Sequence, residues 1–290
     1  MITLIYRHLK LFFKNPGNII LSFLSSGVIL SLYFLFIRDF TIKAVSDYGF
    51  SSNYNDLFVD KLMTSGLLIV IGATSVLSII FIFVKDRYSG TIKDFLVTPI
   101  SEIKIVYSYF FASFLISMFI STICFIGIEL FFMCYYNVIN DFNTLFYSFL
   151  ILFCSNIIAS LLILIIALGI HNFTSFSTFE TLYGVVIGFF TGVYIPIGYY
   201  PSIIRNLFFY FPLCQTTSVL RNIQSKSISL TILENYPSET HHILYETFGI
   251  HLTLNERTIM FETQIKMIIV AIFLLNFILI FLISFKKYRS

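Results

Sequence analysis

Charge is what this 290-residue sequence has least of. Only 11% of its residues are Asp, Glu, Lys or Arg, whereas 58% are hydrophobic; soluble domains carry about 25% charged residues. A chain this short would expose much of that apolar surface to water, which excludes a soluble globule and indicates a membrane protein. The net charge of +3 is too small and too scattered to indicate a nucleic-acid surface.

Tryptophan is absent and cysteine is rare. The sequence has 36 Phe and 18 Tyr, so an aromatic belt at the membrane interface must consist of these two residue types. The four cysteines, Cys124, Cys134, Cys154 and Cys214, form no C-x-x-C pair and have no histidine cluster beside them. We therefore expect small apolar fillers and no metal or redox site, with a bridge between Cys134 and Cys214 as the alternative.

Long stretches without charge predict the membrane spans. A bilayer core about 30 Å thick requires about 20 helical residues. The longest charge-free stretch, 142–179, holds two spans because its polar segment 169–175 does not suit lipid. We expect an all-α polytopic membrane protein, one domain over 1–290. Its six transmembrane helices are expected over 18–37, 62–84, 105–130, 145–168, 179–197 and 264–285.

The distribution of Lys and Arg predicts the orientation, because basic loops are retained in the cytoplasm. With both termini inside, the cytoplasmic segments hold ten cations and three acids, and the outer loops hold eight cations and ten acids. We therefore expect a multi-pass plasma-membrane protein with both termini cytoplasmic. Glu180 and His171 then fall near the inner turn between the fourth and fifth helices, interpreted as a hydrated loop or, alternatively, a second docking contact.

Residues 1–15 predict an interfacial elbow helix that lies on the inner leaflet. Arg7, Lys10 and Lys14 suit the anionic lipid surface, and Asn15-Pro16-Gly17 ends the helix. Its expected apolar face consists of Ile2, Ile5, Leu9, Phe12 and Phe13. The alternative is a plain basic flank of the first span.

The loop 85–104 predicts a short cytoplasmic helix between Ser89-Gly90 and Pro99. We expect Thr91 to cap this helix, with Asp94 at the third position as in a capping box. Ile92, Phe95 and Leu96 form an apolar stripe at helical spacing. Such a stripe packs on the ends of its own helices or inserts into a groove of another protein.

An apolar run beyond residue 192 is broken repeatedly by glycine and proline. Its 15 uncharged residues 206–220 are too few to cross a bilayer, so residues 198–262 predict re-entrant helices between the fifth and sixth spans and a polar extracellular lobe over 222–262. The breaks are Gly192, Pro196, Pro201 and Pro212. No H-E-x-x-H spacing occurs, so no metal site is expected.

Three stretches together resemble the membrane-spanning permease subunits of the ABC type-2 exporter family. They are the basic elbow Leu9–Pro16, the loop Asp86–Ile100, and the outer stretch Gly192–Pro201 with Phe211-Pro212 and Leu220-Arg221. The loop residues that match the family pattern are Asp86, Gly90, Thr91, Leu96, Pro99 and Ile100. Tyr88 replaces a common acid and Lys93 replaces the usual Glu, so a family salt bridge at those positions is unsupported.

The resemblance implies an exporter with two permease and two ATP-binding subunits, in which the helix of the first cytoplasmic loop couples nucleotide-driven closure to the membrane path. The implied coupling residues are Asp86, Gly90, Thr91, Ile92, Asp94, Phe95, Leu96 and Pro99. No G-x-x-x-x-G-K-[ST] motif is present, so we expect no cofactor on this chain, and ATP with Mg in a partner ATPase. A second permease subunit, identical or similar, is expected to complete the cavity.

We therefore expect a permease that exports a lipophilic or amphipathic compound such as a drug, peptide, toxin or glycolipid. Alternatives are export of a lipid-linked polysaccharide or wall polymer, a polytopic membrane enzyme, or a channel. Within the spans the only borderline acid is Glu129, expected at the outer interface or, alternatively, along the pathway. The abundance of Phe, Ile, Tyr, Asn and Lys is typical of a low-GC bacterium, which favours multidrug or bacteriocin export.

Overall fold

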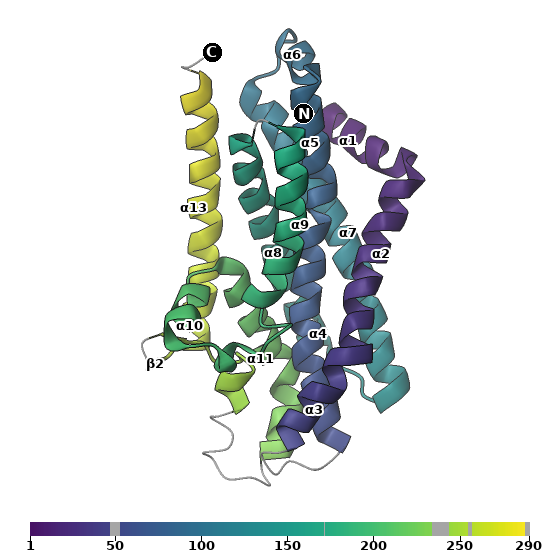
Figure 1. Ribbon diagram of the computed structural model, residues 1–290, viewed down its shortest axis with the longest axis vertical. Coiled ribbons are helices and arrows are strands. Elements are labelled where there is room, and N and C mark those ends of the chain that lie inside the picture. Colours follow the sequence, from purple (N-terminus) through teal and green to yellow (C-terminus); the bar gives the residue numbers. More distant parts are fainter. Residues whose placement is uncertain (47–52, 171, 234–243, 255–256, 288–290) are drawn as a thin grey trace.

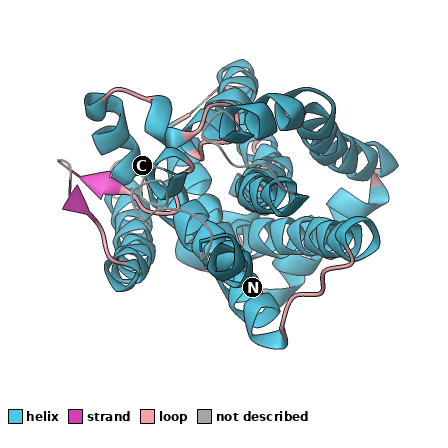
Figure 2. Ribbon diagram, turned by 90° about the horizontal axis from the view of Figure 1, so that it is seen from below, coloured by secondary structure: helices cyan, strands magenta, loops and turns pink. Residues whose placement is uncertain are grey.

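The chain is a bundle of long helices in the computed structural model, which describes residues 1–46, 53–170, 172–233, 244–254 and 257–287. In chain order the elements are α1 (Ile2–Lys14), α2 (Pro16–Leu32), the π-helix η1 (Tyr33–Ile37), α3 (Arg38–Ser46), α4 (Asn53–Ser75), α5 (Leu77–Tyr88), α6 (Thr91–Leu96), α7 (Glu102–Tyr136), α8 (Phe142–Gly169), α9 (Phe173–Phe190), the 3-10 helix η2 (Ile197–Tyr199), α10 (Ser202–Phe209), α11 (Pro212–Leu233), β1 (Thr253–Leu254), β2 (Arg257–Thr258) and α13 (Phe261–Lys287). Viewed along the long axis, the helices cluster side by side and the two short strands lie at the periphery (Figure 2).

Five helical segments within the described residues are long and apolar enough to cross a membrane. They are Ser22–Lys43, Asp56–Tyr88, Glu102–Tyr136, Phe142–Gly169 and Phe261–Phe285. The first joins α2, η1 and α3, and the second joins α4 and α5. A helical membrane protein is thus confirmed with five candidate spans, whereas six were expected.

The expected span over 179–197 corresponds to α9, which begins and ends about six residues earlier, at Phe173 and Phe190. The polar segment was expected to stay outside a helix, but local hydrogen bonds allow part of it to be helical. The Asn172 side chain accepts from the Thr174 backbone N–H at 2.9 Å and so caps the helix. The Thr178 and Thr181 hydroxyls donate to carbonyls four residues earlier.

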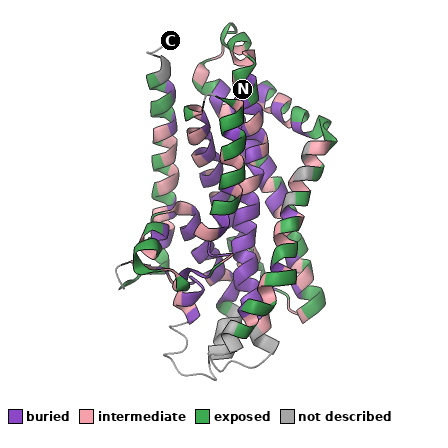
Figure 3. Cartoon of the chain, in the orientation of Figure 1, coloured by how far each residue is buried: buried purple, intermediate pink, exposed green. Residues whose placement is uncertain are grey.

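The α4–α5 segment is the centre of the bundle. It is largely buried, whereas the Ser22–Lys43 and Phe261–Phe285 segments are largely exposed in the isolated chain (Figure 3). Helices α7, α8 and α11 pack against α4, and α7 also packs against α5. Small residues permit close approach: a Cβ at Gly72 would lie 2.3 Å from the Asn156 Oδ1 atom on α8.

The buried face of α1 overlaps the expected one only in part. Leu4, His8 and Phe12, at spacings of four, are buried against the bundle, and Ile5 and Leu9 are half-buried against the core. Ile2 and Phe13 are exposed. The expected face was chosen by hydrophobicity, but the His8 Nε2 atom has a hydrogen-bond partner on α7 and its Nδ1 atom lies beside Arg7, which permits burial of the ring. Helices α1 and α7 therefore pack directly against each other.

The region after α9 contains more helix than expected. Pro201 precedes α10, and Pro212 is the first residue of α11, a position that needs no backbone N–H donor. Because α11 continues to Leu233, residues 222–233 are helical and do not belong to an open polar lobe. The strands β1 and β2 form an antiparallel pair with Thr253 opposite Thr258 and Leu254 opposite Arg257.

Candidate functional site

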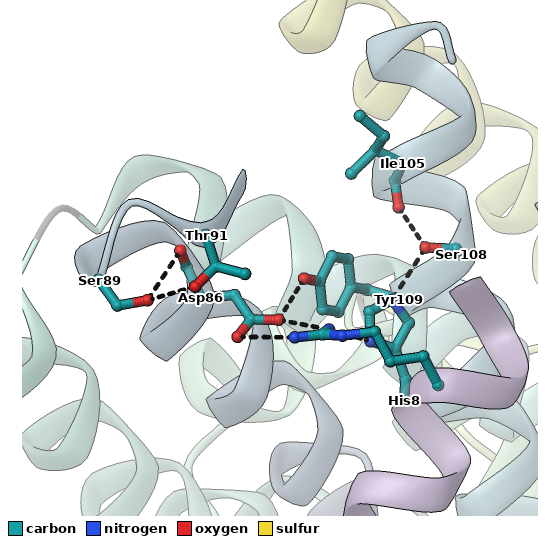
Figure 4. Close-up of polar contacts among 8 residues, drawn as sticks. His8, Asp86, Ser89, Thr91, Ile105, Ser108 and Tyr109 are labelled. Atoms are coloured by element: carbon teal, nitrogen blue, oxygen red, sulfur yellow. Dashed lines mark hydrogen bonds and ion pairs between the residues drawn. The ribbon is translucent and has the colours of Figure 1, made fainter. Parts of the chain in front are cut away.

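A polar cluster joins α1, α5, α6 and α7 at the end of the bundle where α6 lies (Figure 4). We call Arg7, His8, Asp86, Phe95 and Tyr109 the Asp86 junction. The Arg7 Nη1 atom donates to Asp86 Oδ2 at 2.8 Å, and the Tyr109 hydroxyl donates to the same oxygen at 2.7 Å. The Arg7 guanidinium carbon also lies 5.0 Å from the centre of the Phe95 ring on α6. One arginine thus contacts both the carboxylate on α5 and the short helix α6.

His8 completes the Asp86 junction from the neighbouring position on α1. Its ring stacks on Tyr109 with centroids 3.8 Å apart, and its Nε2 atom lies 3.0 Å from the Ser108 hydroxyl oxygen. Burial, assisted by the positive charge of Arg7, lowers the pKa of His8 to about 4. Burial alone would lower the pKa of Arg7, but the hydrogen bond and charge of Asp86 raise it above its ordinary value. At neutral pH the junction therefore contains a charged arginine beside a neutral histidine.

The prediction that Thr91 is the N-cap of α6 is wrong. Gly90 is the N-cap, with φ of +81°, and makes no side-chain capping hydrogen bond, so Thr91 is already helical. The Thr91 hydroxyl instead lies 2.8 Å from the Ser89 hydroxyl. A left-handed glycine lets α5 end and α6 begin within two residues. Asp94 remains in the first turn, where its charge suits the helix dipole.

The apolar stripe of α6 divides between two environments. Ile92 and Phe95 are half-buried against the hydrophobic core. Leu96 is 47% exposed, and Val97, just after the helix, is 88% exposed. Pro99 is also exposed. The inner side of α6 therefore contacts the chain's own helices, and its tip presents apolar side chains to the surroundings.

Arg87 connects the same end of the bundle to α8. Its Nη1 atom donates to the carbonyls of Ala167, Leu168 and Ile170 at 3.0–3.3 Å. These carbonyls lie at the C-terminus of α8, where the helix dipole favours a cation. The end of α5 thus holds α1, α6, α7 and α8 together.

A second carboxylate cluster lies at the opposite end of the central segment. We call Tyr33, Arg38, Asp60 and Tyr136 the Asp60 junction. The Arg38 Nε atom lies 3.1 Å from both Asp60 oxygens, and the hydroxyls of Tyr33 and Tyr136 each donate to the carboxylate at 2.6 Å. Asp60 is fully buried, so its negative charge is stabilised by these protein partners and not by water.

The next residue, Lys61, is also buried and leads to Glu129. Its Nζ atom donates to Asn140 Oδ1 at 2.5 Å, and Asn140 Nδ2 donates to Glu129 Oε2 at 2.8 Å. Gln224 Nε2 donates to Glu129 Oε1 at 3.1 Å. The structure therefore places Glu129 in an internal network that connects α4, α7 and α11.

Of the residues expected in the re-entrant region, Gly192 contacts Arg221 of α11. Its guanidinium is buried and donates to the carbonyls of Leu62, Gly192 and Phe248 at 2.8–3.0 Å. Burial lowers the pKa of Arg221 to about 10, which leaves it charged at neutral pH. Gly192 adopts φ of +66°, and a Cβ there would meet Ile197 at 2.6 Å. Pro196 introduces η2, and the four breaks expected from the sequence all lie near helix boundaries.

Several residues of these clusters were not predicted as site residues from the sequence: His8, Tyr33, Arg38, Asp60, Lys61, Tyr109 and Tyr136. The spacing Leu4–His8–Phe12 is the one signal that could have identified His8. Of the elbow cations, Arg7 belongs to the Asp86 junction, Lys10 lies 5.9 Å from the Tyr6 ring centre, and Lys14 is exposed. Ion pairs between residues 79 or 22 positions apart leave no local pattern.

The fold and the Asp86 junction define a polytopic membrane protein in which the short helix α6 contacts the long helices of the bundle. The family model described as ABC-2 type transporter matches residues 1–225. The chain therefore belongs to the ABC-2 type transporters and is a membrane permease domain without an ATPase domain of its own, as expected from the sequence. No curated protein matches it. Membership in this family implies an ATPase partner.

Proposed function

We propose that this chain is the permease subunit of an ATP-driven exporter that moves a lipophilic or amphipathic compound out of the cell. The partner ATPase binds ATP and Mg and docks on α6. Two permease subunits, identical or similar, enclose the path within the plasma membrane. This proposal supplies the direction and the substrate class that family membership leaves open.

The contact of Arg7 with both Phe95 and Asp86 carries the proposal. A displacement of α6 moves Phe95, and Arg7 transfers that displacement to α1 and to Asp86 on α5. Because Tyr109 holds the same carboxylate, α7 follows. Leu96 and Val97 at the tip of α6 are apolar and exposed, which suits insertion into an apolar groove of another protein.

The arrangement of helix ends supports six spans with both termini in the cytoplasm. Helix α1, the C-terminal end of α13 and α6 lie at one end of the bundle (Figure 1). Helix α9 starts near α5 at this end, where Phe173 contacts Phe81, and finishes where Phe190 contacts Phe208 of α10. Its 18 residues extend about 27 Å, close to the thickness of a hydrocarbon core. We therefore assign α9 as the sixth span.

Two charges on the tip of α6 test the docking role. Leu96→Asp combined with Val97→Asp is expected to abolish co-purification with an ATPase encoded beside this gene, because the charges would enter an apolar groove. Phe95→Ala is expected to retain the complex but lose most substrate-stimulated ATPase activity, since Arg7 loses its contact with α6. Pull-down and ATPase assays in proteoliposomes measure the two effects.

Ile203→Asp provides the matched control. Ile203 is 83% exposed on α10, which lies away from α6, so this variant should assemble and hydrolyse ATP normally. Normal complex formation by the α6 double variant would exclude α6 as the ATPase docking site.

A further inference from the structure

A cavity of about 680 Å³ lies between α1, the start of α2, the α4–α5 segment and α9. Along the central segment its lining includes Thr74, Ser78, Ile82 and Asp86, which are four residues apart and therefore share one helical face. Asp86 follows Thr74 by 12 positions, a distance of about 18 Å along the helix. The cavity is therefore elongated and leads from the Asp86 junction into the bundle.

Glu180 lies at the deep end of this cavity. Helices α5 and α9 run in opposite directions, and the Phe81 and Phe173 rings are 4.8 Å apart. Glu180 follows Phe173 by seven residues, and Thr74 precedes Phe81 by seven, so each lies about 10 Å further in. Both residues line the cavity. The expected hydrated loop position of Glu180 is thus wrong, because the residue lies inside a helix.

Hydrogen-bond acceptors dominate the deep end. The Thr74 hydroxyl donates to the Val70 carbonyl at 2.9 Å, and the Ser75 hydroxyl donates to the Ile71 carbonyl at 2.7 Å. With their hydrogens engaged, both oxygens offer lone pairs to the cavity. Within the described part of the chain, the Glu180 carboxylate has no hydrogen bond or ion pair to another side chain. This combination matches a ligand group that only donates and carries positive charge.

The opposite end of the cavity has the opposite charge. Lys14 and Lys85 line it together with Arg7, whose charge is already paired with Asp86. The positive charge of the two lysines disfavours a cationic group of a ligand at this end and favours a polar or anionic group. Phe81 and Ile82 supply an apolar wall between the two ends. The cavity therefore suits an amphiphile inserted with its cationic group innermost.

We propose that this cavity binds an amphiphile through a primary ammonium group, which donates to the Glu180 carboxylate and to the Thr74 and Ser75 hydroxyl oxygens. The proposal rests on the proposed function in treating this amphiphile as the exported compound. Glu180 then determines specificity, because a neutral or anionic headgroup leaves the carboxylate without a partner.

The test uses two dansyl probes that differ only in the end of a short alkyl chain, a primary ammonium or a hydroxyl. Fluorescence titrations use the full chain in phosphatidylcholine nanodiscs. Glu180→Gln is expected to weaken binding of the ammonium probe about tenfold or more and to leave the hydroxyl probe unchanged. Ser75→Ala should weaken the ammonium probe about threefold. Glu262→Gln, which removes an exposed carboxylate at the start of α13, should change neither affinity.

Retained binding of the hydroxyl probe shows that the Glu180→Gln cavity is folded. Equal loss of both probes, an unchanged affinity for the ammonium probe, or no saturable ammonium binding by the wild-type chain would each overturn the proposal. Tighter binding of a sulfonate-ended probe that Lys85→Gln abolishes would also overturn it. No ATPase is present in these titrations, so a failure of α6 docking is measured separately and refutes only the exporter assignment.

Discussion

The two ends of the central segment are built from the same parts with different outcomes. Asp60 and Asp86 lie 26 positions apart on α4–α5, and each accepts from an arginine near the N-terminus and a tyrosine of α7. Tyr109 and Tyr136 lie 27 positions apart on α7. These separations correspond to about 40 Å, close to the thickness of a bilayer with its headgroup regions.

The difference lies in what each junction leaves free. In the Asp60 junction the side chains of Arg38 and Asp60 are 17% and 0% exposed, and two tyrosines complete the carboxylate shell. In the Asp86 junction those of Arg7 and Asp86 are 32% and 10% exposed, and Arg7 continues to Phe95 on α6. Under the proposed function we therefore expect the Asp60 junction to act as a fixed anchor and the Asp86 junction to act as a joint that transmits movement.

Asp60→Ala should break the anchor and give the largest loss of stability. It leaves two tyrosine hydroxyls without their acceptor and leaves Arg38 with Asp56, 3.9 Å away, as its remaining anionic partner, an expected cost of about 3–5 kcal/mol. Thermal unfolding in micelles, followed by circular dichroism, measures the loss. Thr98→Ala serves as control, because its exposed hydroxyl donates only to the Phe95 carbonyl within its own loop. A loss below that of Asp86→Ala would contradict the comparison.

Asp86→Ala should destabilise the chain less, by about 1.5–3 kcal/mol, because water reaches Arg7 after the change. Its larger effect should be on coupling: substrate-stimulated ATPase activity falls while the complex with the ATPase remains. The same unfolding assay and an ATPase assay in proteoliposomes separate the two effects. Equal losses of coupling in Asp60→Ala and Asp86→Ala, at matched amounts of folded protein, would remove the distinction between anchor and joint.

Acid should weaken the Asp86 junction selectively, since it contains His8 and the Asp60 junction contains no histidine. The pKa of His8 is lowered to about 4, so its contribution is present above about pH 6.5 and is lost as the pH falls toward 4. Between about pH 7.5 and pH 5.5 the expected loss is about 1.4 kcal/mol. His8→Gln should reduce the dependence of the unfolding free energy on pH in this range. An unchanged pH dependence in that variant would show that His8 is not its cause.

The smallest expected effect concerns the contact between Arg7 and Phe95. A double-mutant cycle with Arg7→Gln and Phe95→Leu should give a coupling energy of about 0.5–1 kcal/mol. A cycle of Arg38→Gln with Phe95→Leu is the control, because those residues lie in different junctions and should be additive. Additivity in the Arg7 cycle as well would show that α6 is not attached through this arginine.

The sequence predicted those features that follow from composition and local pattern. Charge-free stretches located the long helices, and the loop motif located α6 and Asp86. The start of α9 was misplaced because Asn172, Thr178 and Thr181 satisfy their polar groups locally, which hydropathy does not record. The buried face of α1 was predicted only in part for a similar reason: His8 is buried because Ser108 and Tyr109 contact its ring.

The partners of the buried charges could not be predicted from the sequence. Arg7 and Asp86 are joined by packing of α1 against α5 and α7, and Arg221 finds three carbonyls from separate segments. Their identities depend on how helices cross, which neither periodicity nor spacing specifies. The same holds for Glu180, whose place in the cavity depends on how α9 packs against α5.

The π-helix η1 explains how one helix holds Asp60 with two side chains. Tyr33 and Arg38 are five positions apart and would point about 140° away from each other on a regular α-helix. The Arg38 backbone N–H instead bonds to the Tyr33 carbonyl, an i+5 connection that stacks the two residues on one side. The one extra residue in this turn therefore places the side chains of both Tyr33 and Arg38 within hydrogen-bond distance of the Asp60 carboxylate. A regular α-helix over these same residues would turn Arg38 away while leaving every side chain of the Asp60 junction in the sequence.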